Sequence, residues 1–257
     1  MTQSLISIIT PLYNNEQFIA QTIESVLKQT YTNWELIITD DCSTDHSYEI
    51  AFSYSYDPRI KIFRLEKNMN YPYAKDFSLQ KAKGKYITFL DSDDIWKENM
   101  LENQIQFMQA NNYSFIYARA ETINVNGNVT GILKGKKRVG YLSTLFCNYI
   151  ESSNAMYDRD KVGYISVQNI ERADWALWLL ILRKVKYCYC NPLVVSQYRI
   201  HEKSMSHKKM RLFKQQFLVY NQFLGYNSLK SFLILFFIFL PLIIIKKIKI
   251  KIDSVTY

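Results

Sequence analysis

The sequence predicts an α/β fold built on a mostly parallel central sheet. Three observations support this. Short apolar runs rich in β-branched residues recur in the first hundred residues, longer segments of helical period separate them, and carboxylates follow the second and fourth runs. The chain has 257 residues, 48% of them hydrophobic and 21% charged, so it can bury a core of its own. We therefore expect strand–helix–strand units with right-handed crossovers.

The elements expected in the first hundred residues alternate. Composition predicts strands over Leu5–Thr10, Glu35–Thr39, Ile60–Leu65 and Tyr86–Leu90, and periodicity predicts helices over Glu16–Lys28, Thr44–Ser53 and Tyr73–Ala82. The first helix is the clearest, because apolar side chains such as Ile19 and Ile23 recur on one face. Ligands of such a sheet bind beyond the carboxyl ends of the strands, so the chemistry is expected in the segments that follow them.

Beyond residue 94 the pattern is less regular. We expect helices over Glu98–Asn111 and Asp174–Lys184, and strands over Ser114–Ala118 and Leu193–Tyr198. Asn126-Gly127 predicts a hairpin turn. The four cysteines are Cys42, Cys147, Cys188 and Cys190. They are too few and too scattered for a disulfide framework, which suits a reducing compartment. The spacing of Cys188 and Cys190 does not suit zinc and a second pair is lacking, so we expect packing roles for these two.

The net charge of +9 lies in the C-terminal segment. Residues 203–257 hold ten basic side chains against Asp253 alone, which leaves 22 basic and 22 acidic side chains in residues 1–202. An uncharged apolar run, Ser231–Ile245, is flanked by Lys230 and by the lysines of residues 246–251. As a helix it would be about 22 Å long, short of the roughly 30 Å hydrocarbon core of a bilayer.

A membrane-associated helical tail is therefore predicted, held against an anionic surface by its lysines. The stretch Lys208–Tyr220, with an apolar stripe among basic residues, supports the same interpretation. A buried core helix is the alternative. We expect no nucleic-acid partner, because the apolar run lacks interleaved polar and aromatic residues that could read bases.

Paired carboxylates follow the fourth predicted strand. Asp91 and Asp93 are one residue apart at the end of an extended segment, so both side chains can face one ligand. Hard carboxylate oxygens suit Mg²⁺ or Mn²⁺, which usually bridge to substrate phosphates. The alternative is an acidic turn that caps the next helix.

Three segments in order carry a resemblance to a known family. They read SIITPLYN from Ser7, ITDDCSTD from Ile38 and KGKYITFLDSDDIW from Lys83, and together they resemble glycosyltransferases of family 2. The resemblance implies the GT-A fold, a Rossmann-like nucleotide-sugar-binding fold. It also implies that nucleotide-sugar contacts are made by Pro11, Tyr13, Glu16, Asp40, Asp41, Asp91 and Ser92. Asp93 would be the direct metal ligand, with Asp91 and His201 as further ligands of Mn²⁺ or Mg²⁺.

Further segments match less well. Asn68–Asp76 departs from the family pattern by carrying Lys75 in place of an arginine, which keeps a cation for the diphosphate but loses the bidentate fork. Asp174 falls on the position of the catalytic base, although Ala173 replaces the usual acidic neighbour. Arg199 and His201 lie in a segment resembling the one that closes over the phosphates.

The resemblance implies an inverting, metal-dependent glycosyltransferase that moves a sugar from a nucleotide donor, a UDP-sugar, to a lipid-diphosphate-linked saccharide in bacterial surface-polysaccharide synthesis, such as O-antigen, capsule or teichuronic acid. Residues 1–206 would form the GT-A domain, with a nucleotide-sugar-binding half (1–97) and an acceptor-binding half (98–206), and residues 207–257 the tail. With no signal peptide recognised, the expected location is the cytoplasmic face of the inner membrane. The alternatives are a nucleotidyltransferase and a non-catalytic sugar-nucleotide binding protein.

Overall fold

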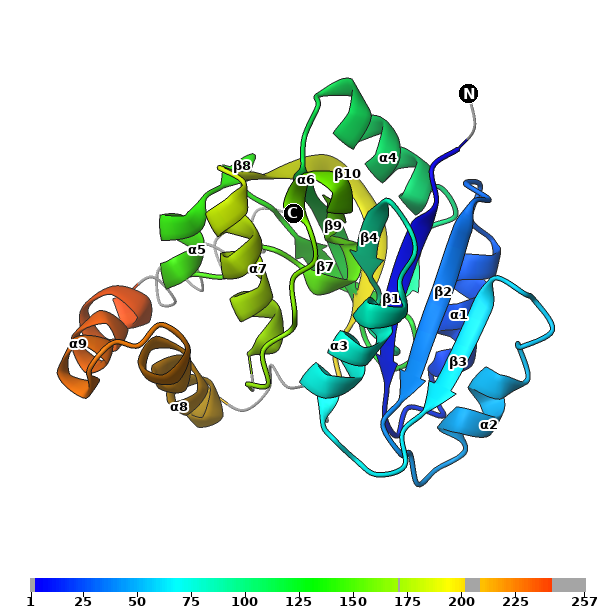
Figure 1. The fold of residues 1–257 in the computed structure, drawn as a ribbon, viewed down its shortest axis with the longest axis horizontal. Helices are drawn as coiled ribbons and strands as arrows, with labels where there is room; N and C mark the ends of the chain where they lie inside the picture. The colour runs from blue at the N-terminus through cyan, green and yellow to red at the C-terminus, as the bar shows by residue number, and fades with distance from the viewer. Residues whose placement is uncertain (1–2, 171, 202–208, 242–257) are drawn as a thin grey trace.

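The computed structural model describes residues 3–170, 172–201 and 209–241. Within them, one sheet of ten strands has the order β3-β2-β1-β4-β9-β6-β10-β5, with β7 beside β6 and β8 beside β10 (Figure 1). The strands are β1 (Ile6–Leu12), β2 (Trp34–Asp40), β3 (Ile60–Arg64), β4 (Tyr86–Phe89), β5 (Ile95–Trp96), β6 (Phe115–Ile123), β7 (Val129–Leu133), β8 (Arg138–Val139), β9 (Met156–Asp158) and β10 (Cys188–Arg199).

The sheet has a parallel half and a mixed half. Strands β3, β2, β1 and β4 are all parallel, as the alternation of strands and helices predicted. The short strand β9 then pairs antiparallel with both β4 and β6, while β6 and β10 are parallel to each other. The four parallel strands all end at the same edge of the sheet, which brings the segments after β1, β2 and β4 together.

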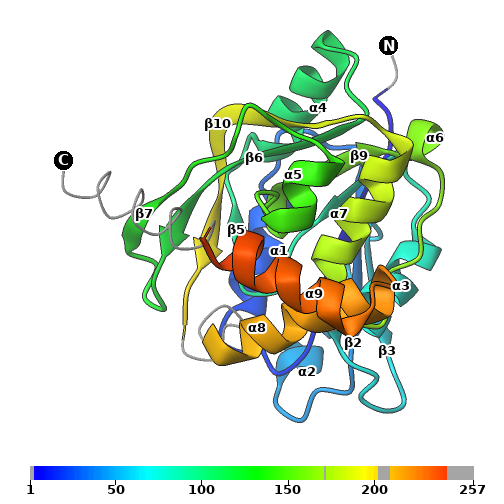
Figure 2. The same ribbon diagram turned by 90° about the vertical axis from the view of Figure 1, so that its left-hand side faces the viewer.

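Helices cover both faces of the sheet (Figures 1 and 2). They are α1 (Ile19–Leu27), α2 (Ser47–Phe52), α3 (Tyr71–Lys81), α4 (Met100–Ala110), α5 (Tyr141–Phe146), α6 (Arg159–Val162) and α7 (Ala173–Lys184). Neighbouring side chains of one strand point to opposite faces: Ile8 packs in the core cluster shared with α1 and α4, and Ile9 in the cluster shared with α3 and α7. Such two-sided burial explains the continuous apolar runs of the sequence.

Several boundaries differ from the predicted ones. The last strand is longer than the predicted Leu193–Tyr198, because buried polar residues such as Asn191 and Arg199 extend it and hide the strand pattern. The hairpin at Asn126-Gly127 is confirmed: β6 and β7 pair antiparallel, and Gly127 has a φ of 83°. The expected packing roles of Cys188 and Cys190 are also confirmed, since both are buried free thiols.

The C-terminal part that is described forms a helical hairpin. Helix α8 (Lys209–Leu218) continues as a π-helix (Val219–Phe223), and after a turn at Gly225 the chain enters α9 (Ser228–Ile234) and a second π-helix (Leu235–Phe239). The hairpin packs on α7 and α5, as Figure 2 shows. Tyr220 sits edge-to-face against Trp175, and its hydroxyl donates to the Leu145 carbonyl at 3.0 Å. In the described part of the chain, no helix has both the length and the apolar character that a membrane crossing requires.

A close approach of two strands depends on Gly84, in the loop before β4. A Cβ there would lie 2.5 Å from the Ser7 amide nitrogen and 2.8 Å from the Leu5 carbonyl oxygen, both in the backbone of the neighbouring segment. The space is used by hydrogen bonds instead: the Gly84 amide donates to Ser7 Oγ at 2.8 Å, and Ser7 Oγ donates to Glu35 at 2.6 Å.

Gly84→Ala should therefore lower the free energy of unfolding by about 2 kcal/mol, because the backbone of β1 must shift to make room. Urea unfolding followed by circular dichroism measures it. Gly131→Ala is the matched control, since its Cβ would meet one side-chain oxygen, Thr122 Oγ1 at 3.2 Å. Equal stability of the two variants would contradict this account.

Candidate active site

A cleft of about 720 Å³ opens at the carboxyl ends of β1 and β4. The predicted site residues that line it are Pro11, Tyr13, Asp41, Asp91, Ser92, Asp93, Asp174 and His201. Four others, Glu16, Asp40, Lys75 and Arg199, do not line it. The edge of the sheet thus gathers the carboxylates that the sequence places after separate strands, as expected for parallel topology.

One end of the cleft is formed by the loops after β1 and β2, and it is called here the donor end because the family resemblance assigns these loops to the nucleotide sugar. Asp41 is buried and accepts a hydrogen bond from the Met69 amide at 2.6 Å, and burial raises the pKa of this carboxyl. Its neighbour Asp40 is fully buried. Asp40 Oδ2 accepts a hydrogen bond from the Ser43 amide at 3.1 Å and lies 3.4 Å from Arg64 Nε. Glu16 accepts from the His46 amide at 2.9 Å, outside the cleft. Of this set, the structure therefore presents Asp41 to a ligand and uses Asp40 and Glu16 to hold the loops.

The loop after β4 carries the acidic motif. His201 Nε2 lies 2.9 Å from Asp93 Oδ2, and Asp91 faces the same cleft. Desolvation raises the pKa of Asp91 to about 6. The positive charge of Lys75 opposes this rise, and the negative charges of Asp174 and Asp93 add to it. Asp94 is buried, where desolvation and its acidic neighbours raise its pKa well above the ordinary value, and it accepts from Ser153 Oγ and the Arg199 amide.

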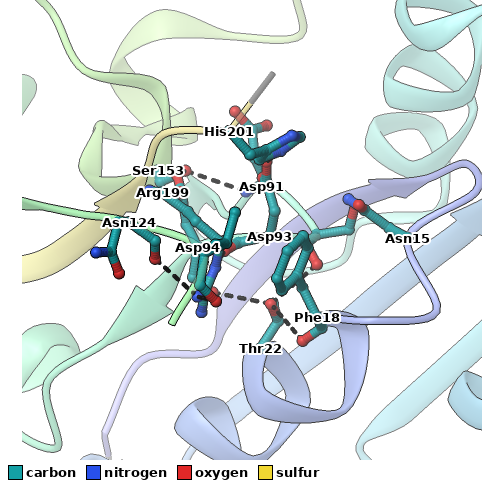
Figure 3. Close-up of polar contacts among 12 residues, drawn as sticks. Asn15, Phe18, Thr22, Asp91, Asp93, Asp94, Asn124, Ser153, Arg199 and His201 are labelled. Carbon is teal, nitrogen blue, oxygen red and sulfur yellow. Dashed lines mark hydrogen bonds and ion pairs between the residues drawn. The ribbon is translucent and has the colours of Figure 1, made fainter. Parts of the chain in front are cut away.

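Arg199 binds this loop and does not line the cleft. Figure 3 shows it together with Asp93, Asp94 and Phe18. Its side chain is 1% exposed, and its guanidinium donates to the Asp93 carbonyl at 2.8 Å, to Gln21 Oε1 at 2.9 Å and to the carbonyls of Asn124 and Val125 at 3.3 and 3.2 Å. Its face lies 4.5 Å from the ring of Phe18. Arg199 thus joins α1, the acidic loop and the β6–β7 hairpin through hydrogen bonds, and its predicted contact with the nucleotide sugar stays a prediction.

Asp174 lies at the first turn of α7, opposite the acidic loop, and its side chain is 27% exposed. The fully buried Lys75 forms an ion pair with it, and the Lys75 ammonium also donates to Tyr71 Oη at 2.8 Å and Ser152 Oγ at 3.0 Å. Tyr71 Oη lies 3.0 Å from Asp91 and 3.1 Å from Asp174. All three donors of the Lys75 ammonium are engaged by protein groups, and Lys75 does not line the cleft, so its predicted contact with a diphosphate stays a prediction.

The other end of the cleft lies between α7 and α8 and is called here the α7–α8 end. It is formed by Arg172, Ala173 and Trp175 at the start of α7 and by Gln215 of α8. Arg172 donates to Gln216 Oε1 at 2.8 Å and lies over Trp175. The sequence analysis missed these residues, because nothing in their spacing shows that α8 returns to the cleft. Tyr71, which stands one helix turn before Lys75 in α3, was missed as well.

The residues present fit a divalent ion that is shared with a substrate. The described residues contain no cluster of three or more His, Cys, Asp and Glu side chains able to hold an ion unaided. Asp93 and His201 nevertheless converge, and Asp91 lies in the same cleft. Carboxylate oxygens such as those of Asp91 and Asp93 suit Mn²⁺ or Mg²⁺, and such sites usually take their remaining ligands from water and substrate phosphates.

Comparison with known proteins agrees with this geometry. The family Glycosyl transferase family 2 matches residues 7–162. A putative teichuronic acid biosynthesis glycosyltransferase of Bacillus subtilis is 35% identical over 210 residues, 80% of this chain and 83% of its own. An Escherichia coli UDP-Glc:alpha-D-GlcNAc-diphosphoundecaprenol beta-1,3-glucosyltransferase is 38% identical over 212 residues, 82% of this chain and 83% of its own.

Solved structures show the fold. The structure of S. aureus TarS with UDP-GlcNAc superposes with a TM-score of 0.70 at 19% identity, covering 91% of this chain and 70% of that one. A mannosyltransferase of Pyrobaculum calidifontis with GDP-Man and Mn²⁺ gives 0.66 at 13% identity, with the same coverage of both chains. The expected GT-A-like fold is therefore confirmed, and on the sequence match over more than half its length the chain belongs to glycosyltransferase family 2.

Proposed function

We propose that this glycosyltransferase moves a sugar from a UDP-sugar to a lipid-diphosphate-linked saccharide, with inversion, in the synthesis of a bacterial surface polysaccharide such as an O-antigen or a capsule. The observation that carries the proposal is the convergence of Asp91, Asp93 and Asp174 from two distant segments in one cleft. The relatives support the substrates: one acts, by its name, on UDP-Glc and a GlcNAc-diphosphoundecaprenol. Membership of the family favours glycosyl transfer over the nucleotidyltransferase alternative.

The cleft supplies what a single displacement needs. The acceptor hydroxyl oxygen forms a bond to the anomeric carbon, the bond from that carbon to the diphosphate oxygen breaks, and UDP leaves with the electron pair. Asp174, partly exposed in the cleft, takes the hydroxyl proton. Lys75 and Tyr71 hold this carboxylate in place. With one carboxylate proposed as the external base and none proposed as a nucleophile, a single displacement with inversion is the simpler mechanism.

Asp93, Asp91 and His201 would hold the divalent ion. When bound, that ion neutralises the charge that grows on the leaving diphosphate. Among the described residues, the two buried cations near the donor end, Lys75 and Arg199, are already engaged by protein groups and contribute little to this neutralisation.

Asp174→Asn should reduce turnover about 1,000-fold, because the amide cannot accept the proton. The affinity for UDP with Mn²⁺ should change little, since Asp174 lies across the cleft from the donor loops. Asp93→Asn is the matched variant and should lose the metal-dependent UDP affinity. Transfer assays with a panel of UDP-sugars and calorimetric UDP titrations measure both. Undiminished turnover of Asp174→Asn would exclude it as the base, and a wild-type protein that binds UDP-sugars without transfer would support the non-catalytic alternative.

Lys75→Met should lower kcat about 100-fold while leaving the UDP affinity within about threefold, because the lysine balances Asp174 and Asp91 and does not reach the donor. Lys81→Met, on the same helix, is the control. Steady-state kinetics and UDP titration give the comparison. A tenfold loss of UDP affinity at unchanged kcat would instead assign Lys75 to the diphosphate, as the family resemblance implies.

We also propose that the α8–α9 hairpin rests on the membrane that carries the acceptor. Six apolar side chains point outward from α9 and its π-helical continuation and form the α9 outer face: Leu229, Phe232, Leu233, Phe236, Phe237 and Ile238. The opposite side of the same helix packs on the core through Ser231, Ile234 and Phe239. From residue 209 to 252 the sequence has eight basic side chains and no acidic one. An apolar face among cations suits the interface of an anionic bilayer.

Replacing both Phe232 and Phe236 by Glu should reduce binding to phosphatidylglycerol vesicles more than tenfold, because two aromatic rings leave the bilayer and two negative charges approach it. Phe52→Glu on α2 is the control, since Phe52 and Phe236 are both 53% exposed. Vesicle cosedimentation gives the affinity. Vesicle binding of the double variant equal to that of wild type would refute the proposed membrane contact. If sedimentation velocity showed a dimer for wild type and a monomer for the double variant, the α9 outer face would instead be assigned to a second copy of the chain.

A further inference from the structure

The α7–α8 end of the cleft carries a cation that the donor site does not use. Among the described residues lining the cleft, Arg172 is the one arginine or lysine, and no described carboxylate forms an ion pair with it. Its guanidinium has a single hydrogen-bond acceptor, Gln216 Oε1, although it can donate five. Burial lowers the pKa of Arg172, but a guanidinium stays charged in a protein. The negative charge of Asp174 acts on Arg172 from a distance, but no described carboxylate makes a close ion pair with this mostly buried guanidinium, so a bound anion would supply that close counter-charge.

Two independent features beside Arg172 also suit an anion. Gln215 is 2% exposed and lines the cleft, yet its Nε2 has no hydrogen-bond partner among the described residues. Helix α7, which is 12 residues long, begins at Ala173, and no side chain caps its first turn. The start of α7 and Gln215 line the same end of the cleft, so an anion bound there would lie near the positive end of the helix dipole and near the unpartnered amide.

From these contacts we infer that the α7–α8 end binds the diphosphate of a lipid-linked acceptor, through the Arg172 guanidinium, Gln215 Nε2 and the first amides of α7. The inference rests on the proposed function and names the part of the site that holds the acceptor. Arg172 supplies the planar fork that a phosphoryl oxygen pair matches, and Gln215 supplies one further donor.

The position of this subsite agrees with the two ends of such an acceptor. Asp174 is two residues from Arg172, so a diphosphate at Arg172 places the hydroxyl of the attached sugar ring within reach of the base. On the other side, Gln215 belongs to α8, which packs against the segment carrying the α9 outer face, as the contact of Phe213 with Phe239 shows. A lipid chain leaving the diphosphate therefore emerges beside the surface proposed to contact the bilayer.

Farnesyl diphosphate tests the subsite without knowledge of the acceptor sugar. Calorimetric titration into the full chain, with Mn²⁺ and saturating UDP to fill the donor end, should give a Kd that rises at least tenfold in Arg172→Gln and less in Arg172→Lys. Farnesol, which lacks the diphosphate, should bind wild type and Arg172→Gln equally. Arg183→Gln, an exposed arginine on the same helix, should bind farnesyl diphosphate like wild type.

Equal affinity of wild type and Arg172→Gln for farnesyl diphosphate would overturn the subsite, as would equal affinity of wild type for farnesol and farnesyl diphosphate. The transfer assay separates this from the proposed function. Transfer to a lipid-diphosphate-linked saccharide with a KM unchanged by Arg172→Gln would reject the subsite alone. Arg172-dependent binding in a protein that transfers no sugar from any UDP-sugar would support the subsite and reject the proposed function.

Discussion

The architecture of this protein depends on keeping several carboxylates close together at one edge of a sheet. Asp91, Asp93 and Asp94 follow β4, and Asp174 approaches them from α7. Buried carboxylates lose hydration and repel one another. Both effects raise the pKa values of Asp91 and Asp94. Two fully buried cations balance them: Lys75 from the side of Asp174 and Arg199 from beneath the acidic loop. Removing either would leave uncompensated charge inside the protein.

This use of cations divides the cleft into two chemically different ends. Among the described residues near the donor loops, Lys75 and Arg199 are engaged by protein acceptors, so the proposed function assigns the charge of a nucleoside diphosphate to a metal ion. At the α7–α8 end, Arg172 keeps unused donors. The two proposals therefore assign two diphosphates to different partners, one to a metal ion and one to a guanidinium.

The sequence predicted the parallel half of the sheet because strands buried on both faces are continuously apolar. It also predicted the edge at which the carboxylates meet, since parallel strands end together. It did not predict β9, whose three residues are too few to show a period, or the full length of β10, in which buried Asn191 and Arg199 interrupt the apolar pattern. The roles of Lys75 and Arg199 were equally out of reach, because a basic residue in a motif looks the same whether it faces phosphate or protein.

The sequence by itself determined the family, the order of the first strands and the identity of the acidic motif. These are local properties, written in side-chain period and in short ordered segments. Only the tertiary structure decided which side chains reach the cleft, because burial and hydrogen-bond partners depend on segments far apart, such as Lys75 with Asp174. It also showed that residues 209–241 form a hairpin with one face on the core and one exposed, and that Gln215 of this hairpin lines the cleft. Packing of α8 on α7 fixes that position, and no pattern within either helix encodes it.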